Sequence, residues 1–344
     1  MSKKALITGI AGQDGSYLSE FLLHKGYEVH GVILHSENTA RIERLSNDEN
    51  IMGKVFFLHY GDLSDSQGIF EIVQSVLPDE LYNLGGQSHV GKSFEQPEYT
   101  GDVTGLAVTR LLEAVRKATP SCRFFQASSA DLFGSTPPPQ SEESAFHPRS
   151  PYAVSKLYGH WATVNYREAY GLHASCGILF NHESPRRGDD FVTKKITKAI
   201  ARILAGRQDK LSMGNLEGRK DWGFAPDYVE CMWLMLQQDS ADDYVIGTGQ
   251  NHSVKEFLTL AFEYAGLEWQ KYVEIDPKFL RPAEVSIIQS DNSKVKKCLG
   301  WSPRVSFDEL VYIMMDYDLT AEGCDVLGKG FACLKEKNFD WITC

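Results

Sequence analysis

The feature that most constrains the fold of this chain is a glycine-rich turn close to its start. Residues 4–8 read as a short buried strand, and apolar side chains at 18, 21, 22 and 23 mark the helix that follows. Between these two segments lie Gly9, Gly12 and Gly15, in the spacing G-x-x-G-x-x-G. Glycines at a strand-to-helix turn let backbone N–H groups and the helix dipole approach a pyrophosphate. The turn therefore predicts a dinucleotide-binding fold.

Further strand-like runs follow along the chain, and each ends in a polar or glycine-rich turn. They cover residues 26–33, 55–60, 80–84 and 123–127. Alternating strands and helices predict an α/β fold with a Rossmann-like, doubly wound parallel sheet. Ligands of such sheets bind along the carboxyl ends of the strands. The features expected on this rim are the glycine turn, Asp62, Ser88, Ser129 and the helix of Tyr152.

Two short segments contain the candidate catalytic side chains, Ser129 and Asp131 in one and Tyr152 and Lys156 in the other. Ser150 is a good helix N-cap, so Tyr152 and Lys156 fall at i and i+4 on one face of the helix that it begins. A nearby ammonium favours the phenolate and lowers the pKa of a tyrosine. Such a group can oxidise an alcohol, and a carboxylate beside it can remove a proton from carbon. The alternatives are a surface helix and an aspartate that only caps its loop.

The order of these motifs resembles that of the extended short-chain dehydrogenase/reductases that modify nucleotide sugars. Within them, the chain is similar to the GDP-mannose 4,6-dehydratase family over roughly residues 3–318. The most specific stretch is residues 179–188, LFNHESPRRG. Supporting stretches are residues 7–18, 59–63, 152–158, 191–196 and 221–223.

The resemblance implies a role for each candidate catalytic residue. Tyr152 would take the proton of the C4 hydroxyl, Ser129 would hydrogen-bond that oxygen, and Lys156 would bind the nicotinamide ribose. Asp131 would then remove the C5 proton while water is lost across C5 and C6, and hydride would return to C6 to give a GDP-4-keto-6-deoxy sugar. The family has threonine at position 129 and glutamate at position 131. Losing one methylene withdraws the carboxylate by roughly an ångström, a misplacement that can cost about 10²-fold.

The resemblance also implies a set of cofactor-binding residues. They are Gly9, Gly12, Gln13, Asp14, Gly15, His35, Asp62, Leu63, Leu84, Ser88, Tyr99, Lys156, His182 and Arg187. Tyr99 and His182 could instead be core residues, and Arg187 a solvated charge. The family binds NADP with a pair of arginines after the second strand, where this chain has Leu34, His35 and Ser36. Because an acidic residue for a 2′-hydroxyl is also missing there, NADP is expected from the family and NAD stays possible.

A second set would bind the GDP-linked sugar. Its members are Asn181, Lys195, Arg219, Lys220, Arg281 and Glu284. Lys220 replaces an arginine of the family, with Arg219 just before it, and lysine lacks the planar fork of arginine. Without the resemblance these residues would read as a solvated charged face. The exact sugar, mannose or another such as a heptose, is left open.

Composition excludes several other classes of protein. The chain has 344 residues and a net charge of −11, which argues against nucleic acid as a partner. No apolar run reaches the length of a membrane span or resembles a signal peptide, so a cytoplasmic protein is expected. Seven cysteines lack a metal-binding or disulfide spacing, so we expect no metal. Both ligands are anions, so a local positive pocket is expected from Arg186, Arg187, Lys194, Lys195, Arg219, Lys220 and Arg281.

The sequence suggests two lobes and a tail. Residues 1–180 are expected to form the dinucleotide-binding core, with 240–250 returning to it, and 181–318 mainly the substrate lobe. The tail, 319–344, has no counterpart in the family and no assigned role. The loop 36–41 is about two residues shorter than the family's loop, which makes a tetramer contact, so a homodimer or a homotetramer is expected. The alternative functions are a nucleotide-sugar 4-epimerase or 4-oxidoreductase, and a cofactor-binding regulator with a decayed site.

Overall fold

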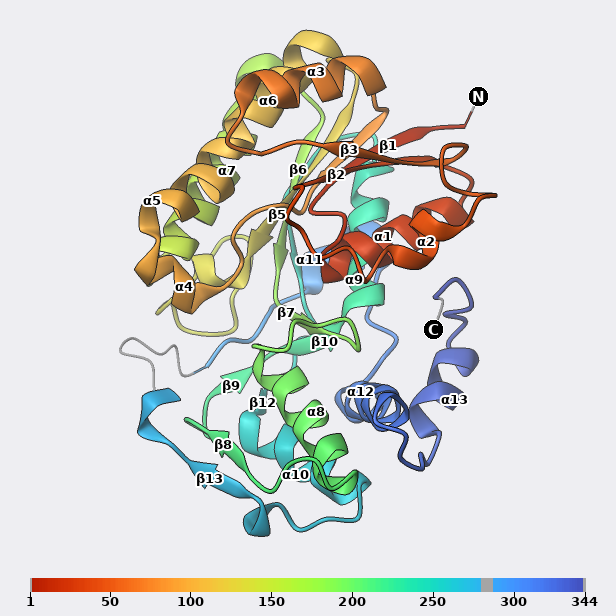
Figure 1. Ribbon diagram of the computed structural model, residues 1–344. Coiled ribbons are helices and arrows are strands. Elements are labelled where there is room, and N and C mark those ends of the chain that lie inside the picture. The colour runs from red at the N-terminus through yellow and green to blue at the C-terminus, as the bar shows by residue number, and fades with distance from the viewer. Residues whose placement is uncertain (1, 280–286, 343–344) are drawn as a thin grey trace.

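The computed structural model describes residues 2–279 and 287–342. Figure 1 shows a core built on a central sheet, above a smaller lobe of helices and short strands. The sheet has seven parallel strands in the order β11-β6-β5-β4-β1-β2-β3. These strands are β1 (Lys4–Thr8), β2 (Glu28–Ile33), β3 (Phe56–Tyr60), β4 (Glu80–Asn83), β5 (Arg123–Ser129), β6 (Ala174–Leu179) and β11 (Tyr244–Ile246). The predicted doubly wound fold is confirmed.

Alternation along β1 explains why both faces of the sheet are covered. Ala5 and Ile7 pack on one side with helices α1 (Gln13–His24) and α9 (Ala225–Leu236). Leu6 packs on the other side with α3 (Ser66–Val76) and α6 (Ala107–Ala118), next to α7 (Pro151–Tyr170). Figure 1 shows these two helical layers on opposite sides of the strands. Strand order reverses between β1 and β4, and this is where ligands of doubly wound sheets bind.

Shorter elements complete the connections within the core. They are α2 (Glu43–Asn47), α4 (Val90–Glu95), α5 (Pro97–Thr100), a π-helical turn η1 (Gly101–Leu106), a 3₁₀ turn η2 (Ala130–Leu132) and α11 (Ser293–Leu299). Strand β11 lies at the edge of the sheet beside β6, although more than sixty residues separate the two in the chain.

The lobe is built from three pairs of short strands and a group of packed helices. The strand pairs are β7 (Asn181–Glu183) with β10 (Trp222–Phe224), β9 (Arg219–Lys220) with β12 (His252–Ser253), and β8 (Leu211–Met213) with β13 (Val273–Ile275). The helices are α8 (Val192–Leu204), α10 (Val254–Tyr264), α12 (Phe307–Ala321) and α13 (Lys329–Glu336), with 3₁₀ turns η3 (Trp269–Lys271) and η4 (Pro277–Phe279). Capping boxes begin α10, with Ser253 and Glu256, and α12, with Ser306 and Glu309.

The tail packs against both parts of the molecule. The Asp316 carboxylate in α12 accepts the backbone N–H of Gly330 at 2.8 Å, which fixes the start of α13. Further along, the Trp341 ring lies 5.1 Å from the Phe21 ring of α1, and its indole N–H donates to Glu230 of α9 at 3.2 Å. Figure 1 shows α13 beside α12, and the end of the chain rising from α13 toward the core. The tail therefore joins the lobe to the helices of the core.

Candidate active site

The turns after β1 and β4 meet at the carboxyl edge of the sheet. The backbone N–H of Gly85 donates to Thr8 Oγ1 at 3.0 Å. Gly9 has φ +67°, and a Cβ there would lie 2.9 Å from the Gly85 backbone, so only glycine fits. Gly15 is equally restricted, because its Cβ would lie 2.3 Å from the Gly9 carbonyl oxygen.

This geometry fits a dinucleotide pyrophosphate. Helix α1 begins directly after Gly12, and among the described residues no side chain caps its first turn. The first N–H groups of the helix and its positive dipole end are therefore available to an anion. The glycine turn satisfies the steric and electrostatic requirements of a phosphate cradle.

The candidate catalytic residues come from the end of β5 and the start of α7. Ser150 caps α7 as predicted, since its Oγ accepts the N–H of Ala153 at 3.1 Å. Tyr152 and Lys156 both lie on the buried face of this helix. Tyr152 is hydrogen-bonded to the side chain of Ser129. The Ser129 hydroxyl also accepts the N–H of Asp131 at 3.2 Å, which folds η2 back toward Tyr152.

Burial dominates the electrostatics of this group. Removal from water raises the pKa of Tyr152, and the charge of Asp131 raises it further, while the hydrogen bond with Ser129 opposes both effects. Burial also lowers the pKa of Lys156 to about 8. The expected lowering of the Tyr152 pKa by Lys156 is not found. The Lys156 ammonium instead donates to the Ala127 carbonyl at 2.8 Å and lies 5.9 Å from the centre of the Tyr152 ring.

The side chains of Gln13 and Asp14 connect the glycine turn to β7. Asp14 Oδ2 lies 2.8 Å from His182 Nε2, and Gln13 Nε2 donates to the His182 carbonyl at 3.1 Å. The Ser184 hydroxyl donates to Gln13 Oε1 at 2.8 Å. Sequence reasoning placed Gln13, Asp14 and His182 around the cofactor, but it gave Ser184 no role and gave no hint of the contact between the two segments.

The remaining cofactor candidates follow the ends of successive strands. His35, after β2, is exposed and stacks on Tyr60 with ring centres 4.0 Å apart. Asp62, after β3, accepts the N–H of Ser64 at 2.8 Å, while Leu63 is half-buried. The residues after β4 are the half-buried Leu84 and the exposed Ser88.

The sequence left a structural alternative for each of Tyr99, Arg187 and His182, and the structure excludes it for the first two. Tyr99 in α5 is 49% exposed and so is not a core residue. Arg187 is not a solvated charge, because its Nε lies 3.1 Å from Glu183 Oε2 and its guanidinium covers the Phe191 ring at 3.7 Å. His182 is buried, as the alternative supposed, but it is also ion-paired. Its role as a cofactor ligand stays a prediction, as do the roles of the other candidates.

Glu183 belongs to this site, although sequence reasoning gave it no role. Its carboxylate accepts the Thr193 hydroxyl at 2.5 Å as well as pairing with Arg187. Because Glu183 ends β7 and Arg187 lies in the turn after it, no local sequence rule indicated this pair.

The expected positive pocket is only partly present. Lys194 is buried in an ion pair with Asp318, and Arg186 pairs with Glu20 at 2.8 Å, so both stabilise the fold. Lys195 donates to the Ser212 carbonyl at 2.6 Å, and Asn181 is the first residue of β7. Two further substrate candidates, Arg281 and Glu284, lie outside the described residues.

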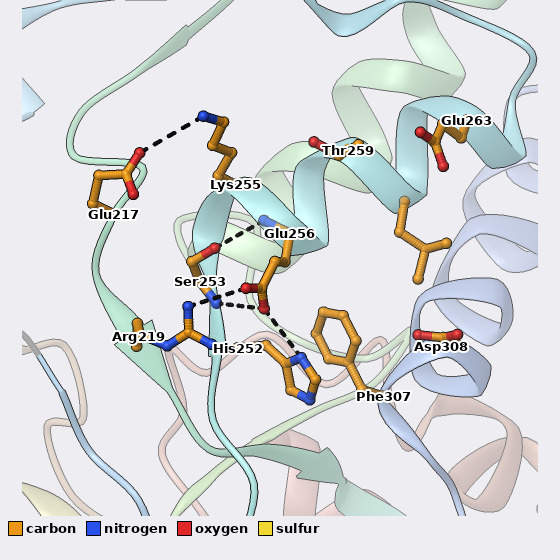
Figure 2. Close-up of a pocket in the computed structure, with 11 residues that line it drawn as sticks. Glu217, Arg219, His252, Ser253, Lys255, Glu256, Thr259, Glu263, Phe307 and Asp308 are labelled. Atoms are coloured by element: carbon orange, nitrogen blue, oxygen red, sulfur yellow. Dashed lines mark hydrogen bonds and ion pairs between the residues drawn. The ribbon is translucent and has the colours of Figure 1, made fainter.

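Arg219 is held on one side of β9. Its guanidinium donates to the Asn251 carbonyl at 3.1 Å and to Glu256 at 3.0 Å. Figure 2 shows Arg219 turned toward Glu256. Both residues line an open groove of about 560 Å³ along α10, and His252 stacks on Phe307 in the same groove. Side chains alternate along a strand, so Lys220 lies on the opposite face of β9. Of the two neighbouring cations, Lys220 is therefore the better candidate for a ligand that binds away from this groove.

The fold and the site together define an extended short-chain dehydrogenase/reductase. A solved structure of DesIV, a dTDP-glucose 4,6-dehydratase from Streptomyces venezuelae with NAD and TYD bound, matches with a TM-score of 0.81 and 22% identity, covering 93% of this chain and 98% of that one. This likeness shows the shared fold. The family model for GDP-mannose 4,6 dehydratase matches residues 6–314, and the chain belongs to this family, as the sequence predicted.

Curated relatives match the chain over nearly its whole length. GDP-mannose 4,6 dehydratase 2 of Arabidopsis thaliana is 58% identical over 324 residues, which cover 92% of this chain and 87% of the relative. GDP-mannose 4,6-dehydratase of Yersinia enterocolitica is 48% identical over 370 residues, covering 98% of each chain. None of the helices in the described part of the chain is long and apolar enough to cross a bilayer.

Proposed function

We propose that this chain is a hydro-lyase, a 4,6-dehydratase that acts on GDP-mannose or a close GDP-linked sugar such as a heptose and uses NADP. The observation that carries the proposal is the place of Asp131, whose backbone N–H donates to the Ser129 hydroxyl at 3.2 Å beside the Ser129–Tyr152 hydrogen bond. An alcohol dehydrogenase or a 4-epimerase needs the hydroxyl, the phenol and the ammonium alone. A dehydratase also needs a base for the proton on C5.

Each residue of the group has a defined task in this reaction. Tyr152 accepts the proton of the C4 hydroxyl, and Ser129, hydrogen-bonded to Tyr152, orients that oxygen. Bound nicotinamide supplies the hydride acceptor for C4 and the hydride donor for C6. Asp131 takes the C5 proton, which the new C4 ketone acidifies, and passes it to the departing C6 hydroxyl to form water. Tyr152 then returns its proton to C5, so one water is lost and no other atom or electron is gained or lost.

The cofactor would lie along the carboxyl edge of the sheet. The glycine turn and the first turn of α1 would hold the pyrophosphate, Asp62 and Leu63 the adenosine end, and Lys156 the nicotinamide ribose. The choice of NADP rests on the family. His35, exposed at the end of β2 and stacked on Tyr60, is the side chain here that could face a 2′-phosphate. A His35→Ala variant should lose affinity for NADPH and keep its affinity for NADH.

Mass spectrometry in D₂O tests the reaction. The protein is incubated with GDP- and UDP-sugars, and the products are examined for loss of one water and for deuterium at C5. A dehydratase gives both signals with a GDP-sugar. Retention of the C6 hydroxyl with inversion or oxidation at C4 would instead identify an epimerase or oxidoreductase. Cofactor binding without turnover of any sugar would identify a regulator.

We also infer that the protein is a homo-oligomer of the cytoplasm, with residues 1–180 and 240–250 as the cofactor core and 181–318 as the substrate lobe. Helix α7 supports the oligomer, because Val154, Tyr158 and Trp161 form an exposed stripe at i, i+4 and i+7. A second copy of the chain would cover this stripe on the same helix whose other face contains Tyr152 and Lys156. Light scattering should give the mass of a dimer or a tetramer. The Trp161→Glu variant should shift that mass toward the monomer.

A further inference from the structure

The glycine turn and β7 are joined by a partly buried ion pair between residues far apart in the chain. Asp14 in the first turn of α1 lies 2.8 Å from the His182 ring of β7. His182 is 8% exposed, and its ring stacks on Tyr228 with centres 4.6 Å apart. Gln13 reinforces the link, because its Nε2 donates both to Asp14 Oδ1 at 3.0 Å and to the His182 carbonyl at 3.1 Å.

The two contacts of the His182 ring favour its charged form. Its Nδ1 lies 2.7 Å from the Phe180 carbonyl oxygen, and its Nε2 lies 2.8 Å from the Asp14 carboxylate. The Phe180 carbonyl and an ionised Asp14 carboxylate only accept hydrogen bonds, whereas a neutral imidazole has a single N–H to donate. With Asp14 ionised, both contacts are therefore satisfied by a ring that carries two protons and a positive charge.

The surrounding charges are consistent with this assignment. Burial alone disfavours a charged imidazole, but the charge and hydrogen bond of Asp14 outweigh it, so the pKa of His182 lies above its usual value. Burial likewise opposes ionisation of Asp14, and His182 overcomes it to lower the Asp14 pKa. Arg187 repels His182 but is itself paired with Glu183. The charge of Asp14 also raises the pKa of Lys156 and of Tyr152, so the pair lies close enough to the candidate catalytic residues to affect their protonation.

We propose that His182 is a positioning residue whose imidazolium holds Asp14, and with it the Gly9–Gly15 turn, in the shape that receives a dinucleotide pyrophosphate. The pair neutralises a carboxylate that would otherwise repel the incoming phosphates. When His182 loses its proton, Asp14 keeps its charge and faces a lone pair on Nε2. Cofactor affinity therefore falls as pH rises. This role rests on the proposed function only in requiring that the chain binds a dinucleotide.

The pH window follows from the two shifts. A group with a raised pKa contributes fully below its ordinary value, near 6.5 for histidine, and the contribution is lost as pH rises through the raised pKa. Asp14 has a lowered pKa, so its contribution is complete above its ordinary value of 3.8 and is lost in acid, as pH falls through the lowered pKa. The coupling should therefore be complete around pH 6 and disappear on the alkaline side.

Titration of the protein with NADPH between pH 6 and 9 tests the proposal. At pH 6 the His182→Gln and Asp14→Asn variants should bind roughly tenfold more weakly than the unchanged protein, the scale of a lost hydrogen bond to a charged group. Their affinities should also lose the alkaline decline that the unchanged protein shows. His173→Gln is the matched control, since His173 hydrogen-bonds the Gln238 carbonyl away from the turn. A decline of the same size in all four proteins would overturn the proposal.

A measurement without cofactor separates this proposal from the function. In ¹⁵N-histidine spectra at pH 7, the His182 signal, assigned by its loss in His182→Gln, should show two protonated ring nitrogens. Hydrogen exchange of residues 9–16 should be faster in His182→Gln, with α3 unchanged. A neutral ring would refute the positioning role even in an active dehydratase. A charged ring in a protein that binds no NADPH would refute the dinucleotide function instead.

Discussion

Replacing Asp131 with asparagine should slow the loss of water while leaving the preceding oxidation at C4 intact. Asparagine keeps the size of the side chain but cannot accept the C5 proton at neutral pH. General base catalysis contributes about 10²- to 10⁴-fold to a rate. The kcat for dehydration should therefore fall by about that factor, which corresponds to an activation free energy higher by roughly 3–5 kcal/mol. Ser129, Tyr152 and Lys156 are unchanged, and C4 oxidation should therefore still occur.

The structure adds a second consequence that concerns Tyr152. The charge of Asp131 is one cause of the raised pKa of Tyr152, after burial. Removing that charge lowers the pKa of the phenol, so C4 oxidation in Asp131→Asn should begin at a lower pH than in the unchanged protein. If Asp131 influenced only the dehydration step, the pH dependence of C4 oxidation would be the same in both proteins.

Stopped-flow absorbance at 340 nm measures both effects. In Asp131→Asn, reduced cofactor should accumulate during a single turnover, and deuterium exchange at C5 should be lost. Asp239→Asn, an exposed carboxylate on the surface, is the control and should match the unchanged protein. Dehydration within about tenfold of the unchanged rate, or continued exchange at C5, would refute the assignment of Asp131 as the base.

Three further substitutions test other parts of the structure. Lys156→Met should abolish turnover yet raise the free energy of unfolding at pH 7 by up to about 3 kcal/mol, because burial lowers the pKa of Lys156 to about 8. Urea titrations should show this gain shrinking between pH 8 and 10.5, because the unfolded chain of the unchanged protein binds more protons than the folded chain in that range. Gly9→Ala should cost about 2 kcal/mol or more in the same titrations and abolish NADPH binding, since φ is +67° and Gly85 blocks a Cβ. Trp341→Ala should lower stability by about 3 kcal/mol with kcat unchanged, as expected of a packing contact with Phe21; an unchanged melting temperature would show that the tail does not support the fold.

Most of the fold could be predicted from local sequence signals. The glycine turn, the Ser150 cap and the Ser253–Glu256 capping box each act within a few residues, and each is present where the pattern indicated. Strand order follows from the alternation of strands and helices, because right-handed crossovers leave few other topologies.

Contacts between distant segments could not be predicted in this way. Lys194 and Asp318, or Asp14 and His182, look in sequence like ordinary polar residues, and only the packing of α8 on α12 or of the glycine turn on β7 brings them together. Arg219 illustrates the same limit. The family resemblance suggested a substrate contact, whereas its pairing with Glu256 depends on the position of α10.

The Tyr152 and Lys156 pair shows why proximity alone does not determine a pKa. Their spacing predicted attraction between an ammonium and a phenolate, and both residues do lie on one face of α7. Burial of that face penalises each charged form, so it raises the pKa of the tyrosine and lowers that of the lysine. With the ammonium bound to the Ala127 carbonyl and 5.9 Å from the ring centre, attraction between the two does not repay this cost. The site therefore rests with its proton on Tyr152. For Tyr152 to accept the proton of a C4 hydroxyl, a positive charge such as that of an oxidised nicotinamide would have to come closer to the phenol than Lys156 lies here.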